Sequence, residues 1–310
     1  MEKRILGKTN LEVSALGFGG GPVGFLGTDR KQVAQVLNGL LDKGVNLIDT
    51  AAVYLGSEEA IGAAVAQRRD EYVLVSKCGQ AFDDIDGDAW SPLAIQQTID
   101  RSLRRLQTDH IDVMLLHSCD LATLKAGDAL GALVDARDAG KIRYIGYSGD
   151  NDAAAYAAAL DEVAVLEISV NICDQANIDS VLPAAQRHNV GVLAKRPIAN
   201  AAWREASEQS GIYVDYAKSY SQRLASMGIE PATFGFTGTA GAAWSELALR
   251  FTLSVAGVTT AIVGTTQPSN VERNLEVVAR GALPDKVVAD LRDAFRRAEN
   301  EAGETWLALT

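Results

Sequence analysis

The sequence is poor in cysteine and has no excess of positive charge. Its three cysteines, Cys78, Cys119 and Cys173, are an odd number without paired spacing, so neither a disulfide framework nor a zinc site is indicated. Lys and Arg number 29 against 40 Asp and Glu, which gives a formal net charge of -11. An acidic surface repels phosphate backbones, which argues against binding to nucleic acid and to anionic membranes.

Long apolar runs are also missing. No uninterrupted stretch of about 18 apolar residues occurs, so no membrane span is expected, and the N-terminus lacks the apolar segment of a signal peptide. Hydrophobic residues nevertheless make up 47% of the 310 residues and charged residues 22%, which is typical of a globular protein. We therefore expect a soluble cytoplasmic protein in which residues 1–310 form one domain. Its oligomeric state is left open.

Short apolar runs alternate with segments of helical periodicity. Eight runs rich in Val, Ile and Leu are expected to be strands, at 15–19, 45–49, 72–77, 111–117, 142–147, 163–170, 190–194 and 260–263. Amphipathic segments between and after them are expected to be helices, at 29–43, 57–68, 91–106, 121–139, 150–160, 178–188, 244–255 and 268–279. This eightfold alternation predicts an α/β fold, a (β/α)8 TIM barrel.

Three segments lie outside the eightfold repeat. Residues 4–6 and 11–14 flank a turn and are expected to form a small hairpin over the bottom of the barrel. Residues 285–301 are expected to form an extra C-terminal helix. Residues 200–241 are unusually long for a loop after the seventh strand, and long loops in compact domains are usually functional or mobile.

Ionisable residues stand at the ends of three consecutive expected strands. Asp49, Lys77 and His117 each follow an apolar run, and Tyr54 lies in the loop after Asp49. A TIM barrel gathers its active site at the C-terminal ends of its strands, so we expect these four side chains to meet. A cation beside a phenol lowers the phenol pKa and makes it a better proton donor near neutral pH. A neighbouring histidine can hydrogen-bond a carbonyl oxygen.

Taken singly, each of these residues has an ordinary structural interpretation. Asp49 with Thr50 is a turn or cap pair, Lys77 a surface lysine, His117 a core histidine and Tyr54 a packing residue. Their coincidence at adjacent strand ends favours catalysis, provided that the barrel is correct. The tryptophans Trp90 and Trp203 are equally well explained as substrate walls or as packing.

Three ordered motifs resemble the signatures of the aldo-keto reductase superfamily. Residues 49–58 read Asp-Thr-Ala-Ala-Val-Tyr-Leu-Gly-Ser-Glu, residues 102–106 read Ser-Leu-Arg-Arg-Leu and precede Asp109, Ile111, Asp112 and His117, and residues 141–148 read Lys-Ile-Arg-Tyr-Ile-Gly-Tyr-Ser. Residues 4–9 and 13–20 are similar to the opening hairpin and first strand of that family. The resemblance extends from about residue 4 to about residue 295.

The resemblance implies an NAD(P)H-dependent carbonyl reductase that acts on a small aldehyde or ketone, including a sugar-like one, or on the alcohol in reverse. It implies that Tyr54 is the general acid, Lys77 tunes it, Asp49 holds Lys77 and His117 orients the carbonyl. No metal is implied, because the hydride comes from nicotinamide. Residues assigned to cofactor binding are Gly20, Gly21, Asp49, Ser148, Glu167, Lys195, Arg196, Gly264, Thr265, Thr266, Asn270 and Asn274.

Several of these positions depart from the family pattern. Glu167 stands where the family usually has Gln, and Lys195-Arg196 replaces the more usual aromatic-Ser pair. Asn270 stands where many members carry an Arg for the 2′-phosphate, and Arg273 is expected on another face of its helix. We expect NADPH as the cofactor, with NADH as the alternative.

Two other functions remain open at the level of sequence. A cofactor-sensing regulatory module, resembling potassium-channel β subunits, would keep the same four residues with little turnover. A lyase or isomerase that uses Lys77 as a Schiff base is disfavoured by the presence of the other three residues.

Overall fold

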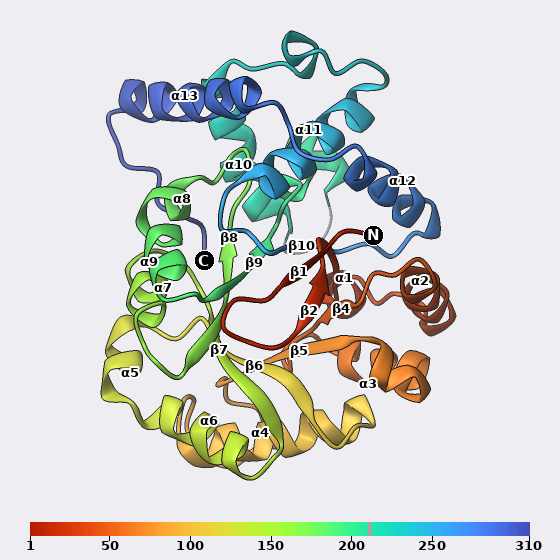
Figure 1. Ribbon diagram of the computed structural model, residues 1–310, viewed down its shortest axis with the longest axis vertical. Coiled ribbons are helices and arrows are strands. Elements are labelled where there is room, and N and C mark those ends of the chain that lie inside the picture. The colour runs from red at the N-terminus through yellow and green to blue at the C-terminus, as the bar shows by residue number, and fades with distance from the viewer. Residues whose placement is uncertain (210–212) are drawn as a thin grey trace.

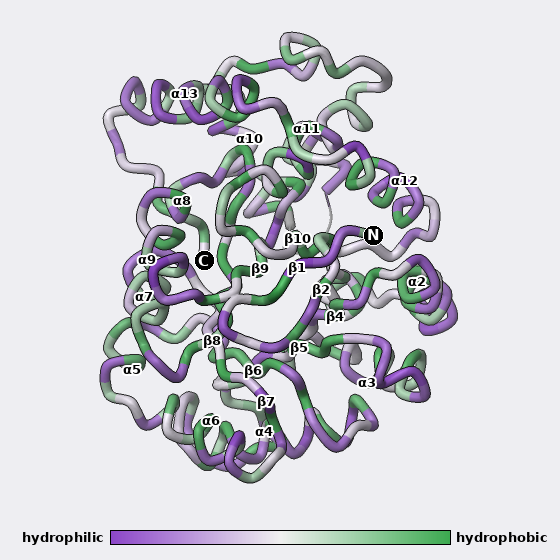
Figure 2. Tube along the Cα trace, viewed as in Figure 1, coloured by the Kyte–Doolittle hydropathy of each residue, from purple (hydrophilic) through white to green (hydrophobic). Residues whose placement is uncertain are grey.

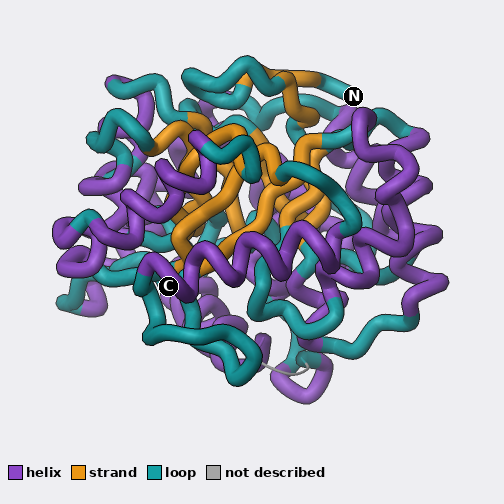
Figure 3. Tube along the Cα trace, turned by 90° about the horizontal axis from the view of Figure 1, so that it is seen from below, coloured by secondary structure: helices purple, strands orange, loops and turns teal. Residues whose placement is uncertain are grey.

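A closed barrel of eight parallel strands forms the centre of the computed structural model, which describes residues 1–209 and 213–310. Helices surround the barrel on its outer side (Figures 1 and 3). The strand order is β10-β3-β4-β5-β6-β7-β8-β9, so the last strand closes on the first. The strands are β3 (Leu16–Gly19), β4 (Leu47–Asp49), β5 (Val73–Cys78), β6 (Ile111–His117), β7 (Ile142–Ser148), β8 (Val163–Ser169), β9 (Gly191–Lys195) and β10 (Thr260–Val263). The predicted TIM barrel is confirmed.

The helices have amphipathic faces that pack on the barrel, with hydrophilic residues turned outward (Figure 2). In α2, the side chain of Asp29 caps the first turn, and Val33, Leu37 and Leu40 are buried. Among the described residues, none of the helices is long and apolar enough to cross a membrane. The helices are α1 (Gly21–Phe25), α2 (Arg30–Asp42), α3 (Ser57–Val65), α4 (Pro92–Leu106), α5 (Leu121–Ala126), α6 (Asp128–Asp138), α7 (Asn151–Ala157), α8 (Ala176–Ser180), α9 (Leu182–Arg187), α10 (Tyr213–Met227), α11 (Ala240–Ser254), α12 (Pro268–Ala279) and α13 (Asp285–Ala302).

Three expected segments differ in the structure. The expected helix at 121–139 is two helices, because Gly127 between α5 and α6 has a left-handed φ of 86° that an α-helix cannot contain. The expected helix at 178–188 is divided into α8 and α9, where Pro183 in the first turn of α9 has no N–H to continue α8. The segment 200–241 contains α10 and short 3₁₀ helices rather than only loop, and its residues 210–212 lie outside the described part.

The expected N-terminal hairpin closes the lower end of the barrel. Strands β1 (Lys3–Ile5) and β2 (Glu12–Ser14) pair antiparallel and lie across one end of the barrel (Figure 1). Leu6, Leu11 and Val13 pack against the interior side chains of the barrel strands. Gly7, at a φ of 56°, lies so close to β9 that a Cβ there would be 2.1 Å from the Gly191 nitrogen. The lower end of the barrel is therefore sealed by apolar packing.

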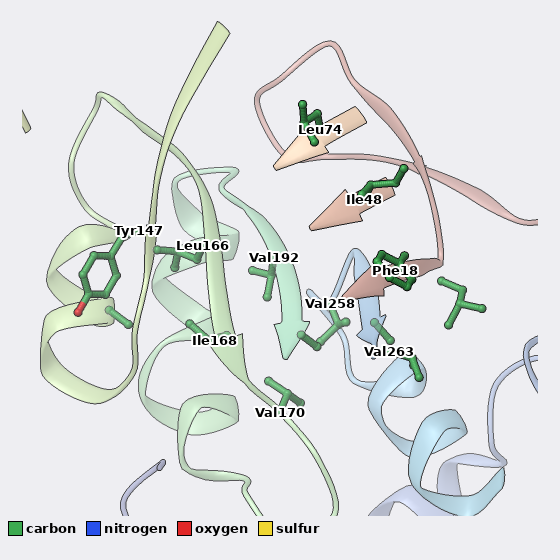
Figure 4. Packing of buried hydrophobic residues seen from close by; sticks show 14 of the residues in the cluster. Phe18, Ile48, Leu74, Tyr147, Leu166, Ile168, Val170, Val192, Val258 and Val263 are labelled. Carbon is green, nitrogen blue, oxygen red and sulfur yellow. The ribbon is translucent and has the colours of Figure 1, made fainter. Parts of the chain in front are cut away.

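Side chains of the strands alternate between the barrel interior and the surrounding helices. Outward-facing residues, such as Phe18, Ile48, Leu74, Leu166 and Val192, belong to the large core between strands and helices (Figure 4). The alternate positions form a second cluster with the hairpin, and its strand residues include Leu47, Val75, Leu115, Val165 and Leu193. Two residues further along each of these five strands stand Asp49, Lys77, His117, Glu167 and Lys195. The period of two therefore turns these polar residues inward, above an apolar floor.

Candidate active site

Lys77 is the centre of a buried ionic cluster at the C-terminal end of the barrel. Its Nζ lies 2.5 Å from Asp49 Oδ1 and 3.0 Å from Glu167 Oε2, and it also donates a hydrogen bond of 2.9 Å to the Thr50 carbonyl. The exposed side-chain fractions are 0% for Lys77, 5% for Asp49 and 4% for Glu167. Strands β4, β5 and β8 thus each contribute one ionisable side chain to an almost fully buried cluster.

The charges of this cluster shift one another's protonation. Burial alone would lower the pKa of Lys77, but the adjacent carboxylates of Asp49 and Glu167 outweigh it and raise that pKa. Burial, followed by the charge of Glu167, raises the pKa of Asp49 well above its usual range despite Lys77. Lys77 therefore stays an ammonium and cannot act as the unprotonated amine that a Schiff base requires.

Tyr54 lies directly beside this cluster. The Lys77 Nζ is 5.3 Å from the centre of the Tyr54 ring, and the ring of His117 meets Tyr54 edge-on at 5.9 Å. Phe25 of α1, a helix that the sequence did not predict, contacts Tyr54 from another side at 5.1 Å. The expected meeting of Asp49, Tyr54, Lys77 and His117 is observed.

The loop that carries Tyr54 is held by the remaining polar residues of its motif. The Ser57 backbone N–H donates to the Tyr54 carbonyl at 2.9 Å, and the Ser57 hydroxyl lies 2.9 Å from that of Thr50. The next residue, Glu58, is buried and accepts a hydrogen bond of 2.8 Å from Ser76, which precedes Lys77 in β5. The Ser-Glu pair thereby fixes the loop to the strand that carries the lysine.

His117 is a neutral imidazole. Burial, together with the positive charges of Lys77 and Lys195, lowers its pKa well below the usual value. Its Nδ1 is buried and has no hydrogen-bond partner among the described residues. A neutral ring with one free nitrogen beside Tyr54 can hydrogen-bond a polar group of a ligand.

A cavity of about 500 Å³ opens above the cluster and extends to the loop after β10. Its lining includes most residues that the sequence assigned to the site: Gly21, Asp49, Tyr54, His117, Ser148, Glu167, Lys195, Arg196, Gly264, Thr265, Thr266, Asn270 and Asn274. Lys77 is fully buried and does not belong to the described cavity lining. Gly20 lies outside the described lining and packs on the barrel instead, since a Cβ there would be 2.7 Å from Ser57 Oγ.

Lys195 and Arg196 are both held by neighbouring groups. The Lys195 Nζ lies 2.8 Å from the buried Asp150 carboxylate, which neutralises its charge. Arg196 donates to Ser169 Oγ at 3.0 Å, and its guanidinium lies 3.9 Å from the centre of the Tyr216 ring. The sequence did not reveal these partners, because Asp150 and Tyr216 are distant in the chain.

Arg273 is a cavity residue, contrary to the expectation that it lies on another face of its helix. It donates to the Asn270 side-chain oxygen, and both residues line the cavity. Positions three apart share a helix face, which explains the contact. A guanidinium is therefore present where α12 lines the cavity, even though position 270 is an amide.

The last two residues, Leu309 and Thr310, form a further part of the site that the sequence analysis missed. The Leu309 carbonyl accepts hydrogen bonds from Arg196 and Ser169, its N–H donates to Asp174 at 3.1 Å, and Thr310 lines the cavity. Such long-range contacts have no local sequence signal.

Neither of the two suggested tryptophans belongs to the described cavity lining. Trp203 stacks on Trp244 at 5.8 Å, and the Trp90 ring fills the space beside Gly79. Both are packing residues.

An α/β barrel with a tyrosine, a buried lysine and a neutral histidine at the mouth defines an enzyme-like site. The sequence model of the aldo/keto reductase family matches residues 15–296, so the chain belongs to this family of oxidoreductases. The family resemblance of the three motifs is confirmed. Such enzymes use NAD(P)H and act on small carbonyl compounds.

Individual relatives cover most of the chain. It is 28% identical over 306 residues to L-galactose dehydrogenase of Arabidopsis thaliana, with 90% of this chain and 88% of the relative covered. It is 26% identical over 316 residues to a probable voltage-gated potassium channel subunit beta of the same plant, with 94% of this chain and 95% of the relative covered. The solved structure of aldo-keto reductase AKR11C1 from Bacillus halodurans, in its holo form, has a TM-score of 0.78 at 27% identity and covers 95% and 96%.

The buried carboxyl of Asp174 predicts a pH effect on stability. Burial, followed by the charge of Asp150, raises its pKa from 3.8 to about 7, while Arg223 opposes this. The folded state then binds more protons than the unfolded state between these values, so this group stabilises most at low pH and its contribution is lost as pH rises through that window. Asp174→Asn should remove this loss, which is on the order of a few kcal/mol, and retain the acceptor for Leu309 and Tyr220.

The measurement is urea unfolding of both proteins from pH 4 to pH 8. The difference in the free energy of unfolding, variant minus wild type, should grow with pH. The exposed Asp83→Asn serves as the control and should show no such trend. A flat difference for Asp174→Asn would mean that Asp174 is already ionised in the folded protein throughout this range.

Proposed function

We propose that this protein is an NADPH-dependent oxidoreductase that interconverts an aldehyde or ketone and the corresponding alcohol, with Tyr54 as the general acid or base. The observation that carries the proposal is the contact of the Tyr54 ring with the buried Lys77 ammonium, next to neutral His117, on the wall of a 500 Å³ cavity. Cavities of this size are ordinary for small ligands. The name of the L-galactose dehydrogenase relative favours a sugar-like substrate.

The far end of the cavity fits the phosphates of a dinucleotide. The loop of Gly264, Thr265 and Thr266 leads into α12, whose first turn receives no side-chain cap from Gln267 in the described chain. Uncapped N–H groups at a helix N-terminus attract anions. Arg273 adds a charge, and Asn270 and Asn274 add amides. This donor set suits a ligand with several phosphate oxygens, and Arg273 is our candidate for the 2′-phosphate.

The nicotinamide, when bound, supplies or accepts the hydride. The residues of this chain manage the proton. The Tyr54 hydroxyl donates its proton to the carbonyl oxygen during reduction, and it takes the proton back during alcohol oxidation. Lys77 favours the resulting phenolate electrostatically. His117, being neutral, donates one hydrogen bond to the same oxygen and orients it.

Replacing the proton donor tests the role of Tyr54. Tyr54→Phe keeps the ring and its packing but removes the hydroxyl. We expect the rate of carbonyl reduction in a single turnover to fall on the order of 10²-fold or more, with cofactor affinity nearly unchanged. Phe25→Leu, which alters a neighbour without a hydroxyl, is the control for disturbed packing. Single-turnover rates of Tyr54→Phe close to wild type would show that another group donates the proton.

Cofactor choice tests the role of Arg273. Arg273→Met removes the guanidinium, so the affinity for NADPH should fall about tenfold or more, since charge-assisted hydrogen bonds to phosphate are strong. The affinity for NADH, which lacks the 2′-phosphate, should be nearly unchanged. Arg280→Met is the matched control, because Arg280 pairs with Glu246 instead. Equal losses for both cofactors, measured by fluorescence titration, would contradict the assignment.

A regulatory role is the second candidate, favoured by the match to a potassium channel subunit beta over most of the chain. In that case the protein would bind NADP(H) but reduce carbonyls slowly. Steady-state turnover on a panel of aldehydes, ketones and sugars, with both cofactors, separates the two functions. Turnover numbers of at least about 1 s⁻¹, in the range of ordinary enzymes, would support the oxidoreductase.

A further inference from the structure

Glu167 gives the buried cluster a second carboxylate for a single ammonium. Its Oε2 lies 3.0 Å from Lys77 Nζ, on which Asp49 also converges at 2.5 Å. Unlike Lys77, Glu167 also lines the cavity. With both carboxylates ionised, the cluster would carry a net charge of -1 among almost fully buried side chains.

Such a charge is costly unless something neutralises it. Two carboxylates that share one cation resist joint ionisation, so one of them retains a proton. The raised pKa of Asp49, caused by burial and then by Glu167, agrees with this. The other ionisable groups around the cluster do not supply the missing positive charge: His117 is neutral, Lys195 is paired with Asp150, and Tyr54 carries no positive charge.

We propose that Glu167 makes this site bind the oxidised nicotinamide cofactor more tightly than the reduced one, with release of the proton that Asp49 holds. The inference rests on the proposed function, which brings a nicotinamide ring to the cavity wall formed by Tyr54 and His117. The oxidised ring carries a positive charge and the reduced ring does not. A buried negative charge on the same wall therefore favours only the oxidised form.

The step is a proton dissociation without electron transfer. The carboxyl O–H bond breaks, its electron pair stays on the carboxylate, and the proton passes to the solvent buffer. The cluster then has a net charge of -1, which balances the bound cationic ring. A Gln at position 167 could not supply the second negative charge of the cluster, because an amide does not ionise.

The first test uses the wild-type protein. Calorimetric titration with NADP⁺ and with NADPH at pH 7, in buffers of different ionisation enthalpy, gives the protons released on binding. NADP⁺ and NADPH both carry the 2′-phosphate. The difference in the number of protons that they release on binding therefore reports the ionisation of the cluster. We expect close to one additional proton released with NADP⁺. Equal proton release for the two forms would overturn the proposal.

The second test is Glu167→Gln, with Glu162→Gln as the control. Glu162 is exposed and does not belong to the described cavity lining, so its replacement removes the same formal charge away from the site. In Glu167→Gln, the ratio of the NADPH to the NADP⁺ dissociation constant should fall on the order of tenfold or more at an effective dielectric constant of about 20. The extra proton release should disappear. Glu162→Gln should retain the wild-type ratio and the wild-type proton release.

An unchanged ratio in a folded Glu167→Gln protein overturns the proposal. If this variant does not fold, the wild-type proton measurement decides alone. The proposed function and the role of Glu167 fail in different ways. A wild-type protein that binds neither NADP⁺ nor NADPH contradicts the proposed function. A wild-type protein that binds both equally, with no difference in proton release, contradicts only the role of Glu167.

Discussion

The ion cluster on Lys77 is the constraint on which the rest of the site depends. A buried ammonium is tolerated only with close, well-placed anions, and Asp49 and Glu167 supply them from two other strands. These carboxylates keep Lys77 charged, and the charge lies next to the Tyr54 ring. If both carboxyl groups moved away, Lys77 would lose the interactions that keep it protonated, and the Tyr54 ring would lose the ammonium beside it.

The barrel provides the necessary geometry through its period of two. Interior positions are apolar at the end that the hairpin seals, and become polar within the last three residues of β4, β5, β6, β8 and β9. The ionic cluster thus lies on an apolar floor that excludes water from below. Low local polarity strengthens its interactions, and it also makes an unbalanced charge in the cluster expensive. The same fold that places the residues therefore determines their protonation.

Much of this arrangement could be predicted from the sequence, for physical reasons. Apolar runs locate the strands, and the end of a run locates Asp49, Lys77 and His117, because parallel strands end on one side. Other features could not be predicted. The pairing of Glu167 with Lys77 and the return of Leu309 and Thr310 to the cavity depend on contacts between distant segments. The break at Gly127 was missed because a glycine within an amphipathic pattern does not by itself end a helix. The face of Arg273 was misjudged, although its spacing from Asn270 contains the answer.

The central claim is that the Lys77 ammonium poises Tyr54 to exchange a proton. The most direct measurement is the pKa of the Tyr54 phenol in the wild-type protein, by NMR titration of tyrosine labelled with ¹³C at the ring carbon that bears the hydroxyl. The Tyr54 signal is assigned by its absence from Tyr54→Phe. The account predicts a pKa at least about one unit below the ordinary tyrosine value of about 10. A value at or above about 10 would contradict it, because the cluster would then leave the phenol no better a proton donor than tyrosine in water.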